Sequence, residues 1–170
     1  KELLGRISEY GLTSNGPMGP VMKAFETIGT AQVAKSANQA RLMGFLSPDD
    51  NITMNRDRLL YDAKLLVIKL SEGYEPPKTR TYSLPGLTGK AALQLAVNDL
   101  ALSGKATSHD IVVSNYLADI LSGGDTDITE LLEEEDILSM EKKTIATLAR
   151  NPATLDRMQH MLETGKPLRN

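Results

Sequence analysis

The sequence contains no cysteine and no tryptophan, and aromatic residues make up only 4% of its 170 positions. Without cysteine, the chain has no disulfide, no thiolate nucleophile and no thiolate metal site. Apolar residues account for 41% of the sequence, so a core must be built mainly from aliphatic side chains. The length suffices for one domain or for two small helical layers.

An excess of positive charge and long apolar runs are also missing. The formal net charge is −3, which gives no electrostatic reason to expect a nucleic acid or an anionic membrane as a partner. No apolar run approaches the roughly 20 residues of a membrane span, and no signal peptide is visible. We therefore expect a cytoplasmic protein with no nucleic-acid partner and no membrane span.

What the chain does have is helix-forming sequence. Apolar residues recur at helical spacing, capping residues precede several of these segments, and alternating strand patterns are nearly absent. The pattern predicts an all-α fold with helices at residues 1–10, 21–31, 36–44, 55–73, 88–103, 108–122, 128–150 and 152–164.

Two of these segments carry apolar faces, and the spacing of the second predicts a buried stripe. Val21, Phe25 and Ile28 share one face of the helix at 21–31. A wider stripe is predicted along the helix at 55–73, formed by Leu59, Leu60, Ala63, Leu66, Val67 and Leu70.

The clearest interruption is at residues 74–89, which hold three prolines and two glycines. Proline and glycine clusters of this kind are typical of loops and linkers. The sequence therefore predicts a first part at residues 1–75, a linker at 76–87 and a second part at 88–170.

Ser108, His109 and Asp110 stand side by side and suggest a catalytic triad at first sight. Successive residues of a helix point about 100° apart, so neighbours in sequence do not face one another as nucleophile, base and acid. Thr107 or Ser108 ahead of an apolar-periodic segment is instead typical of an N-cap, and Asp110 complements the positive end of the helix dipole. We predict that this triplet begins a helix.

Two further segments resemble known binding loops only superficially. Residues 86–92, GLTGKAA, are too short for a phosphate-binding loop and have Ala91 where a hydroxyl residue is required. Residues 125–136, DTDITELLEEED, have Glu130 where a calcium loop needs glycine. His109 and His160, the two histidines of the chain, have no second ligand at metal spacing. We expect no metal site.

The first residues, KELLGRISEYG, form helix from the start without a capping residue. We expect this helix to continue from residues that precede Lys1.

Several stretches resemble a known family. Residues 25–74, from FETIGTAQVAKSANQARLMGFL to the end of DRLLYDAKLLVIKLSEGY, resemble the end of a crotonase domain, the enoyl-CoA hydratase/isomerase fold. SPDDNITMNRD within that stretch, together with HDIVVSNYLADILSGGD and the ending RMQHMLETGKPLRN, is similar to large bacterial 3-hydroxyacyl-CoA dehydrogenases of fatty-acid β-oxidation that are fused to a crotonase-like part. KELLGRI resembles the helix after the glycine-rich segment of crotonases.

The resemblance implies that the catalytic groups lie outside this chain. In that family the oxyanion-hole amides, the catalytic glutamates and the NAD-binding GxGxxG loop lie upstream of the matching residues. Glu2, Glu9 and Glu26 are therefore not expected to be catalytic, and no cofactor is expected in this chain, although the full-length enzyme would use NAD.

The resemblance also implies roles for parts of the chain. Residues 1–75 would be the C-terminal helices of a crotonase-like domain, and residues 88–170 a helical extension. Met43, Phe45 and Leu46 are candidate walls of the acyl-CoA pocket. Candidate partners of the CoA phosphates are Lys23, Lys35 and Lys64.

Two hypotheses of function follow. In the first, the chain is the non-catalytic end of a β-oxidation enzyme, where it packs on the upstream dehydrogenase and crotonase parts, closes the acyl-CoA pocket and forms homo-oligomer contacts. In the second, it is a self-standing helical scaffold or protein-interaction module without enzyme activity. A third possibility is that the chain folds alone but exposes an apolar face where the upstream crotonase part would lie, with Phe25, Ile28 and the stripe at 59–70 as candidates.

Overall fold

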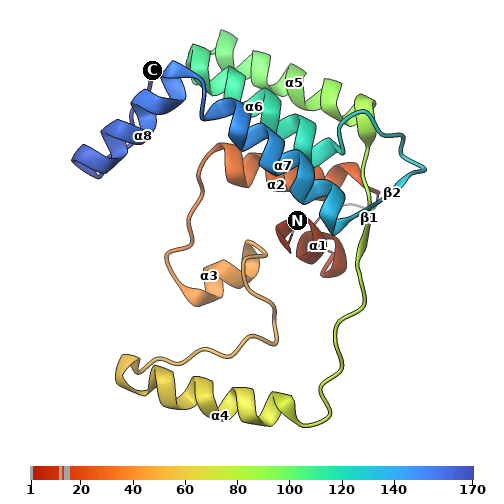
Figure 1. Cartoon of the computed structure of the whole chain (residues 1–170), viewed down its shortest axis with the longest axis vertical. Helices are drawn as coiled ribbons and strands as arrows, with labels where there is room; N and C mark the ends of the chain where they lie inside the picture. Colours follow the sequence, from red (N-terminus) through yellow and green to blue (C-terminus); the bar gives the residue numbers. More distant parts are fainter. Residues whose placement is uncertain (1, 12, 14–15) are drawn as a thin grey trace. The chain divides into compact units, whose positions relative to one another are not determined.

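The computed structural model describes residues 2–11, 13 and 16–170. Helices dominate this part of the chain (Figure 1), so the predicted all-α class is confirmed. The crotonase-like arrangement of these helices stays a prediction. The elements in chain order are α1 (Glu2–Glu9), α2 (Met18–Gly29), α3 (Ala37–Leu42), the 3-10 turn η1 (Arg56–Arg58), α4 (Leu59–Ser71), β1 (Thr81–Ser83), α5 (Gly86–Leu102), α6 (Ser108–Ser122), β2 (Leu131–Glu133), α7 (Glu134–Leu148) and α8 (Pro152–Thr164).

The chain divides into two compact units. The described residues up to Gln32 pack with Arg80–Asn170, and Val33–Thr79 form the second unit. The larger unit is therefore discontinuous in sequence. The predicted functional division into residues 1–75, a linker at 76–87 and residues 88–170 stays a prediction.

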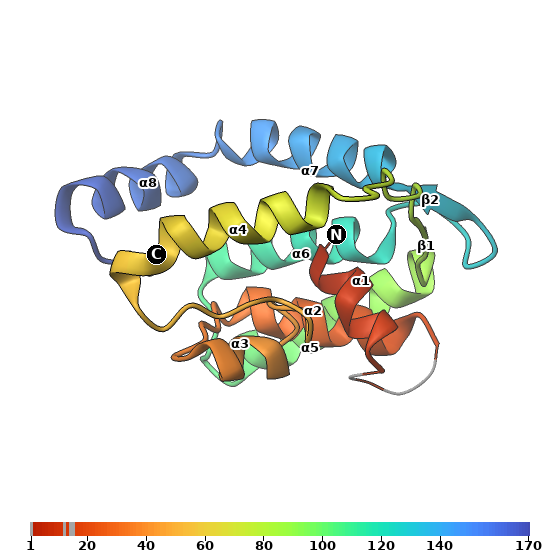
Figure 2. The ribbon, with the colours of Figure 1, turned by 90° about the horizontal axis from the view of Figure 1, so that it is seen from below.

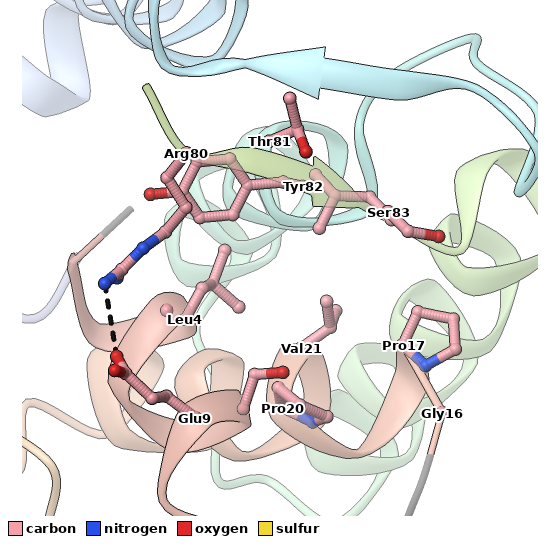
Figure 3. A pocket seen from close by; sticks show the side chains of 13 residues that line it. Leu4, Glu9, Gly16, Pro17, Pro20, Val21, Arg80, Thr81, Tyr82 and Ser83 are labelled. Carbon is pink, nitrogen blue, oxygen red and sulfur yellow. Dashed lines mark hydrogen bonds and ion pairs between the residues drawn. The ribbon is translucent and has the colours of Figure 1, made fainter. Parts of the chain in front are cut away.

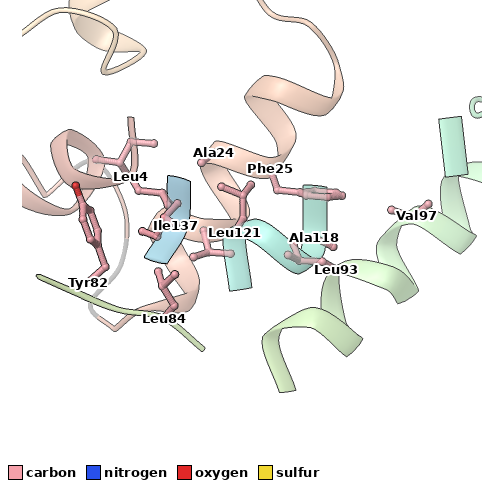
Figure 4. Close-up of a cluster of buried hydrophobic side chains, with 12 residues drawn as sticks. Leu4, Ala24, Phe25, Tyr82, Leu84, Leu93, Val97, Ala118, Leu121 and Ile137 are labelled. Atoms are coloured by element: carbon pink, nitrogen blue, oxygen red, sulfur yellow. The ribbon is translucent and has the colours of Figure 1, made fainter. Parts of the chain in front are cut away.

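Helix α6 is the centre of the larger unit. It contacts α2, α5 and α7, and both ribbon views show it between α5 and α7 (Figures 1 and 2). The core is mainly aliphatic, as the composition requires, with Phe25 and Tyr82 as its two aromatic side chains (Figure 4). It consists of Leu4, Ile7, Val21, Ala24, Phe25, Tyr82, Leu84, Leu93, Val97, Ala118, Leu121 and Ile137.

The bounds of α6 and α8 are those that the capping residues predict. Helix α6 begins after Thr107 and ends at Gly123, whose φ is 92°. Helix α8 begins after Asn151, whose side chain accepts a hydrogen bond from the Ala153 N–H, and ends at Gly165 with φ 68°. Glycine takes such left-handed conformations without steric cost, so each helix has a defined end.

The start of the helix predicted at 128–150 and part of the predicted linker differ from the structure. Residues 128–133 are not helical, because Leu131–Glu133 form β2 and pair antiparallel with β1 inside the predicted linker. Tyr82 lies opposite Leu132 in this pair. Helix α7 then starts after Glu133, which forms a capping box with Asp136. Pairing with a distant segment has overridden the local helical spacing.

The predicted apolar face of α2 is buried in part. Val21 and Phe25 belong to the core, whereas Ile28 is 47% exposed. Ile28 lies in the last turn of α2, one turn beyond the residues that reach the core. The helix also begins at Met18, three residues before the predicted start.

The smaller unit is held by caps more than by burial. Ser36 Oγ accepts from the Gln39 N–H at 3.1 Å and starts α3, but Gln39 Oε1 accepts from the Lys35 N–H instead of completing a capping box. Asn55 Oδ1 accepts from the Asp57 N–H at 3.0 Å and starts η1, which leads into α4.

The predicted burial of the stripe along α4 is wrong for the chain as described. No residue of α4 is buried, and Leu59 and Leu70 are 55% and 60% exposed. The helix forms as the apolar periodicity predicts, but the smaller unit supplies no second layer to cover it. The alternative prediction of an exposed apolar face holds for this stripe and for Ile28, and it is wrong for Phe25, which is buried.

Candidate functional surfaces

The 108–110 triplet forms the first turn of α6. Thr107 Oγ1 accepts from the Asp110 N–H at 3.2 Å, and Asp110 Oδ2 accepts from the Thr107 N–H at 2.9 Å. His109 is only 4% exposed, and its Nε2 lies 2.9 Å from Thr154 Oγ1. The prediction of an N-cap is therefore confirmed, and the side chains of His109 and Asp110 make separate structural contacts.

Asp110 is also the centre of a polar cluster that links α6 to α8. Arg157 Nη2 lies 2.8 Å from Asp110 Oδ1, and Arg157 Nε donates to Asn170 Oδ1 at 2.7 Å. Arg169 Nη2 donates to the Lys105 carbonyl at 2.7 Å and lies 3.7 Å from Asp110 Oδ2. We call Asp110, Arg157, Arg169 and Asn170 the Asp110 cluster.

The pKa of Asp110 reflects this environment. Burial alone would raise the pKa of the carboxyl group, but the hydrogen bonds from the Thr107 N–H and from Arg157 outweigh it and hold the pKa below its usual value. The carboxylate therefore stays charged at neutral pH and holds both arginines.

The role of the cluster is structural. No residue of α8 is buried, so apolar packing contributes little to its position. The Asp110 cluster, the contact of His109 with Thr154 and a 3.0 Å hydrogen bond from Asn170 Nδ2 to the Ala153 carbonyl hold the helix instead.

A cavity of about 520 Å³ lies beside α1 and β1 (Figure 3). Leu4, Val21 and Tyr82 form part of its wall, and Arg80 Nη2 donates to Glu9 Oε2 at 3.1 Å across one end. The guanidinium of Arg80 lies so close to Gly5 that a Cβ there would overlap with it. The positive charge of Arg80 is therefore paired with the carboxylate of Glu9 in the wall of the cavity.

A second cavity of about 490 Å³ lies among α2, α5 and α6. Its lining is largely apolar and includes the buried side chains of Phe25 and Val97. Glu26, Asp99 and Lys105 also contribute to it. None of these three side chains has an ion pair among the contacts of the described residues.

The predicted acyl-CoA wall lies in the smaller unit, directly after α3. Met43, Phe45 and Leu46 are half-buried, and the backbone N–H groups of Phe45 and Leu46 both donate to the Ala40 carbonyl. This turn places the three side chains close together in sequence and space. Their role in binding acyl-CoA stays a prediction.

The three candidate CoA lysines lie on different elements. Lys23 is on α2 in the larger unit, Lys35 precedes α3, and Lys64 is on α4. Lys35 and Lys64 are exposed. Binding of phosphate by any of them stays a prediction.

Helix α4 carries most of the exposed large apolar side chains of the smaller unit. At 100° per residue, four of its side chains align along one side, which we call the α4 seam: Leu59, Ala63, Leu66 and Leu70. Tyr61, Leu65 and Ile68 form the opposite face, and all three are exposed. A groove of about 460 Å³ runs between α4 and residues 51–53 and is lined in part by the seam.

Within residues 2–11, 13 and 16–170, no group of three or more His, Asp or Glu side chains is placed to hold a metal ion. Among the same residues, no helix combines the length and apolar character needed to cross a membrane.

The Asp110 cluster contains the polar contacts that sequence reasoning missed. Arg157, Arg169 and Asn170 lie far from Asp110 in sequence, and no spacing rule connects them. The presence of a carboxylate at the third position of α6 was visible, but it indicated only a dipole contact.

Comparison with known proteins gives one informative similarity. The chain is 42% identical over 155 residues to a probable 3-hydroxyacyl-CoA dehydrogenase of Bacillus subtilis (strain 168). The match covers 91% of this chain but 20% of that protein, so the chain spans about a fifth of the relative's length. No family model and no solved structure matches the chain. The chain is thus similar to one part of a much longer dehydrogenase.

Proposed function

We propose that this chain is the C-terminal, non-catalytic portion of a larger fatty-acid β-oxidation enzyme. That parent would be an NAD-dependent 3-hydroxyacyl-CoA dehydrogenase with an enoyl-CoA hydratase-like part. The observation that carries the proposal is the 42% identity along 91% of the chain to a fifth of a probable 3-hydroxyacyl-CoA dehydrogenase.

The arrangement of the described side chains supports a non-catalytic role. His109 is buried against Thr154, Asp110 is held by Arg157, and Glu9 is paired with Arg80. Each of these groups is thus held by a structural contact. A general acid or base must instead be free to reach the proton that it transfers.

The chain does not fit an NAD site. Its glycines include no G-x-G-x-x-G pattern, and its described strands form one antiparallel pair, whereas a dinucleotide fold needs a parallel βαβ unit. In the proposed parent, NAD is therefore held by residues outside this chain.

The proposed contributions of the chain are packing, closure of the acyl-CoA pocket and oligomer contacts. Exposed apolar side chains on α4 and on α8 support the packing role, because isolated soluble domains seldom leave such surfaces uncovered. On α8 these are Leu155, Met158, Met161 and Leu162. The turn with Met43, Phe45 and Leu46 is the proposed contact with the acyl-CoA substrate.

An antibody raised against the chain tests the proposal directly. On an immunoblot of the source cells, we expect it to detect a polypeptide about five times as long as this chain, in line with the relative. The protein captured by this antibody should oxidise 3-hydroxybutyryl-CoA with NAD. The purified 170-residue chain should neither catalyse that oxidation nor hydrate crotonyl-CoA.

The opposite results support the self-standing helical module instead. A native product near 18.5 kDa, or turnover of either substrate by the chain alone, would overturn the proposed function.

A further inference from the structure

The α4 seam has the spacing of a helix-pairing surface. Leu59, Ala63, Leu66 and Leu70 follow one another at intervals of four, three and four residues, which is the alternation of the two apolar positions of a heptad repeat. Leu59, Ala63 and Leu70 are exposed, and Leu66 is half-buried. The seam is therefore formed, and none of its four residues is fully buried by the smaller unit.

The residues that flank the seam are charged on one side and apolar on the other. Asp62 and Lys69 lie seven residues apart on one flank, and Leu60 and Val67 lie seven residues apart on the other. Leu60 and Val67 are both strongly exposed. Both flanks therefore extend the surface that a partner helix would meet.

We propose that α4 pairs antiparallel with α4 of a second copy of this chain, with Asp62 of each copy facing Lys69 of the other. This pairing deepens the oligomer-contact part of the proposed function and rests on it. In this register, Leu59 packs against Leu70 of the second copy, and Ala63 packs against Leu66.

The antiparallel register brings together matching residues on both flanks of the seam. In an antiparallel helix pair, like flanking positions of the two helices face each other, so each Asp62 meets a Lys69 and each Leu60 meets a Val67. In a parallel pair, by contrast, the charged flank would face the apolar flank of the other copy. The charge pattern therefore specifies the direction as well as the partner.

The local contacts of the two charged residues agree with this pairing. Asp62 already interacts with Arg58 at 3.2 Å and with Thr53 at 3.3 Å, and its side chain is 32% exposed. Lys69 has no ion-pair partner within the part of the chain that the structure describes. The groove of about 460 Å³ beside residues 51–53 is lined by Asp62, Lys69 and three seam residues, and it gives the second helix a concave surface.

The size of the surface sets the strength of the dimer. A helix of 13 residues is about 20 Å long, so this contact is smaller than the roughly 800 Å² per partner of a stable interface. We therefore expect a concentration-dependent dimer.

Sedimentation velocity of the 170-residue chain between about 5 and 500 µM is the first measurement, and it should show a shift from monomer to dimer. Lys69→Glu should weaken the dimer at least about tenfold, because it replaces two attractive contacts by two repulsive ones. Asp62→Lys should weaken it too, and the double variant D62K/K69E should restore the wild-type affinity. Lys64→Glu is the matched control, since it makes the same charge change on α4 away from the seam.

Cross-linking tests the direction of the helices, because the chain contains no native cysteine. Leu59→Cys and Leu70→Cys chains should form a disulfide when mixed and none when kept apart. In the antiparallel register, identical positions near the helix ends lie 11 residues apart along the axis, about 16 Å, whereas a disulfide needs Cα atoms within about 7 Å.

Three results would overturn the pairing: a monomer at every concentration, equal effects of K64E and K69E, or a disulfide within either cysteine variant alone. The first would assign the seam to another part of the parent polypeptide. The mass of the native gene product tests the proposed function separately, so failure of one is not failure of the other.

Discussion

At the scale of single residues, Asp110 makes more contacts than its position at the start of a helix predicts. It receives a hydrogen bond from the Thr107 N–H and pairs with Arg157. Asp110→Ala should lower the free energy of unfolding at pH 7 by roughly 1–2 kcal/mol, since it removes a cap acceptor and an ion pair together. Urea denaturation followed by circular dichroism measures this loss.

The pH dependence of that loss has a definite sign. The pKa of Asp110 is lower in the folded chain than its usual value, so its stabilising contribution is complete above the unfolded pKa of about 3.9. The contribution disappears as the pH falls through the folded pKa. The stability difference between wild type and Asp110→Ala should therefore shrink below about pH 4. An equal difference at pH 7 and pH 3 would contradict this assignment.

Glycine is required at position 86 by the backbone conformation there and by the closeness of Thr126. The φ of Gly86 is +61°, and a Cβ would overlap with the backbone carbonyl of Thr126. Gly104 has a similar φ of +69°, but no atom lies within 4 Å of the position that a Cβ would take there. Gly86→Ala should therefore destabilise the protein by more than about 2 kcal/mol, and Gly104→Ala by only about 1 kcal/mol.

The difference between the two glycine variants isolates the contact with Thr126. Thermal unfolding of both variants under one condition measures it. Equal melting temperatures would show that the loop around Thr126 moves away at no cost.

At the scale of elements, the helix bounds predicted from the sequence were most accurate where capping residues at the two ends of the helix define them. The bounds of α6 and α8 follow from Thr107, Asn151 and two terminal glycines, each within a turn of the helix it limits. The segment at 128–133 was mispredicted because Ile128, Leu131 and Leu132 have helical spacing, while the pairing with β1 involves residues far away in sequence. The Asp110 cluster was missed for the same reason.

Helix α8 is an element held by polar contacts. Because none of its residues is buried, Arg157→Gln should release it while the core around α6 stays folded. We expect backbone amides of α8 to exchange with solvent about tenfold faster, whereas those in the middle of α6 keep their protection. Arg150→Gln is the matched control, since no ion pair of Arg150 is among the described contacts. Uniform acceleration in α6 and α8 would show that Arg157 supports the whole unit instead.

The exposed apolar residues of α4 show a different limit of prediction from sequence. The apolar stripe that includes Leu59, Ala63, Leu66 and Leu70 was visible in the sequence, and it predicted a helix correctly. It did not show which surface covers the helix, because periodicity identifies an apolar face but not its partner. The sequence analysis therefore predicted that this face of α4 is buried within the chain, whereas none of its residues is buried in the structure.

At the scale of the whole molecule, the discontinuous larger unit has a measurable consequence. Residues 74–79 are exposed and outside any helix or strand, so trypsin should cut first after Lys78 or at the neighbouring exposed sites of the smaller unit. A cut after Lys78 gives fragments 1–78 and 79–170. Because α1 and α2 pack with the elements that follow Arg80, including the contacts of α2 with α5 and α6, the two fragments should remain associated.

Gel filtration of the nicked protein followed by denaturing electrophoresis distinguishes the two alternative divisions of the chain. Co-elution of both fragments in one native peak is the expected result, since Val21, Ala24 and Phe25 of the first fragment share a core with Leu93, Val97 and Leu121 of the second. Burial of that many apolar side chains stabilises the nicked complex by several kcal/mol. Phe25→Ala should weaken the association, whereas Ile28→Ala, on the exposed end of the same helix, should not. Separation of the wild-type fragments without denaturant would instead favour two units divided at the linker.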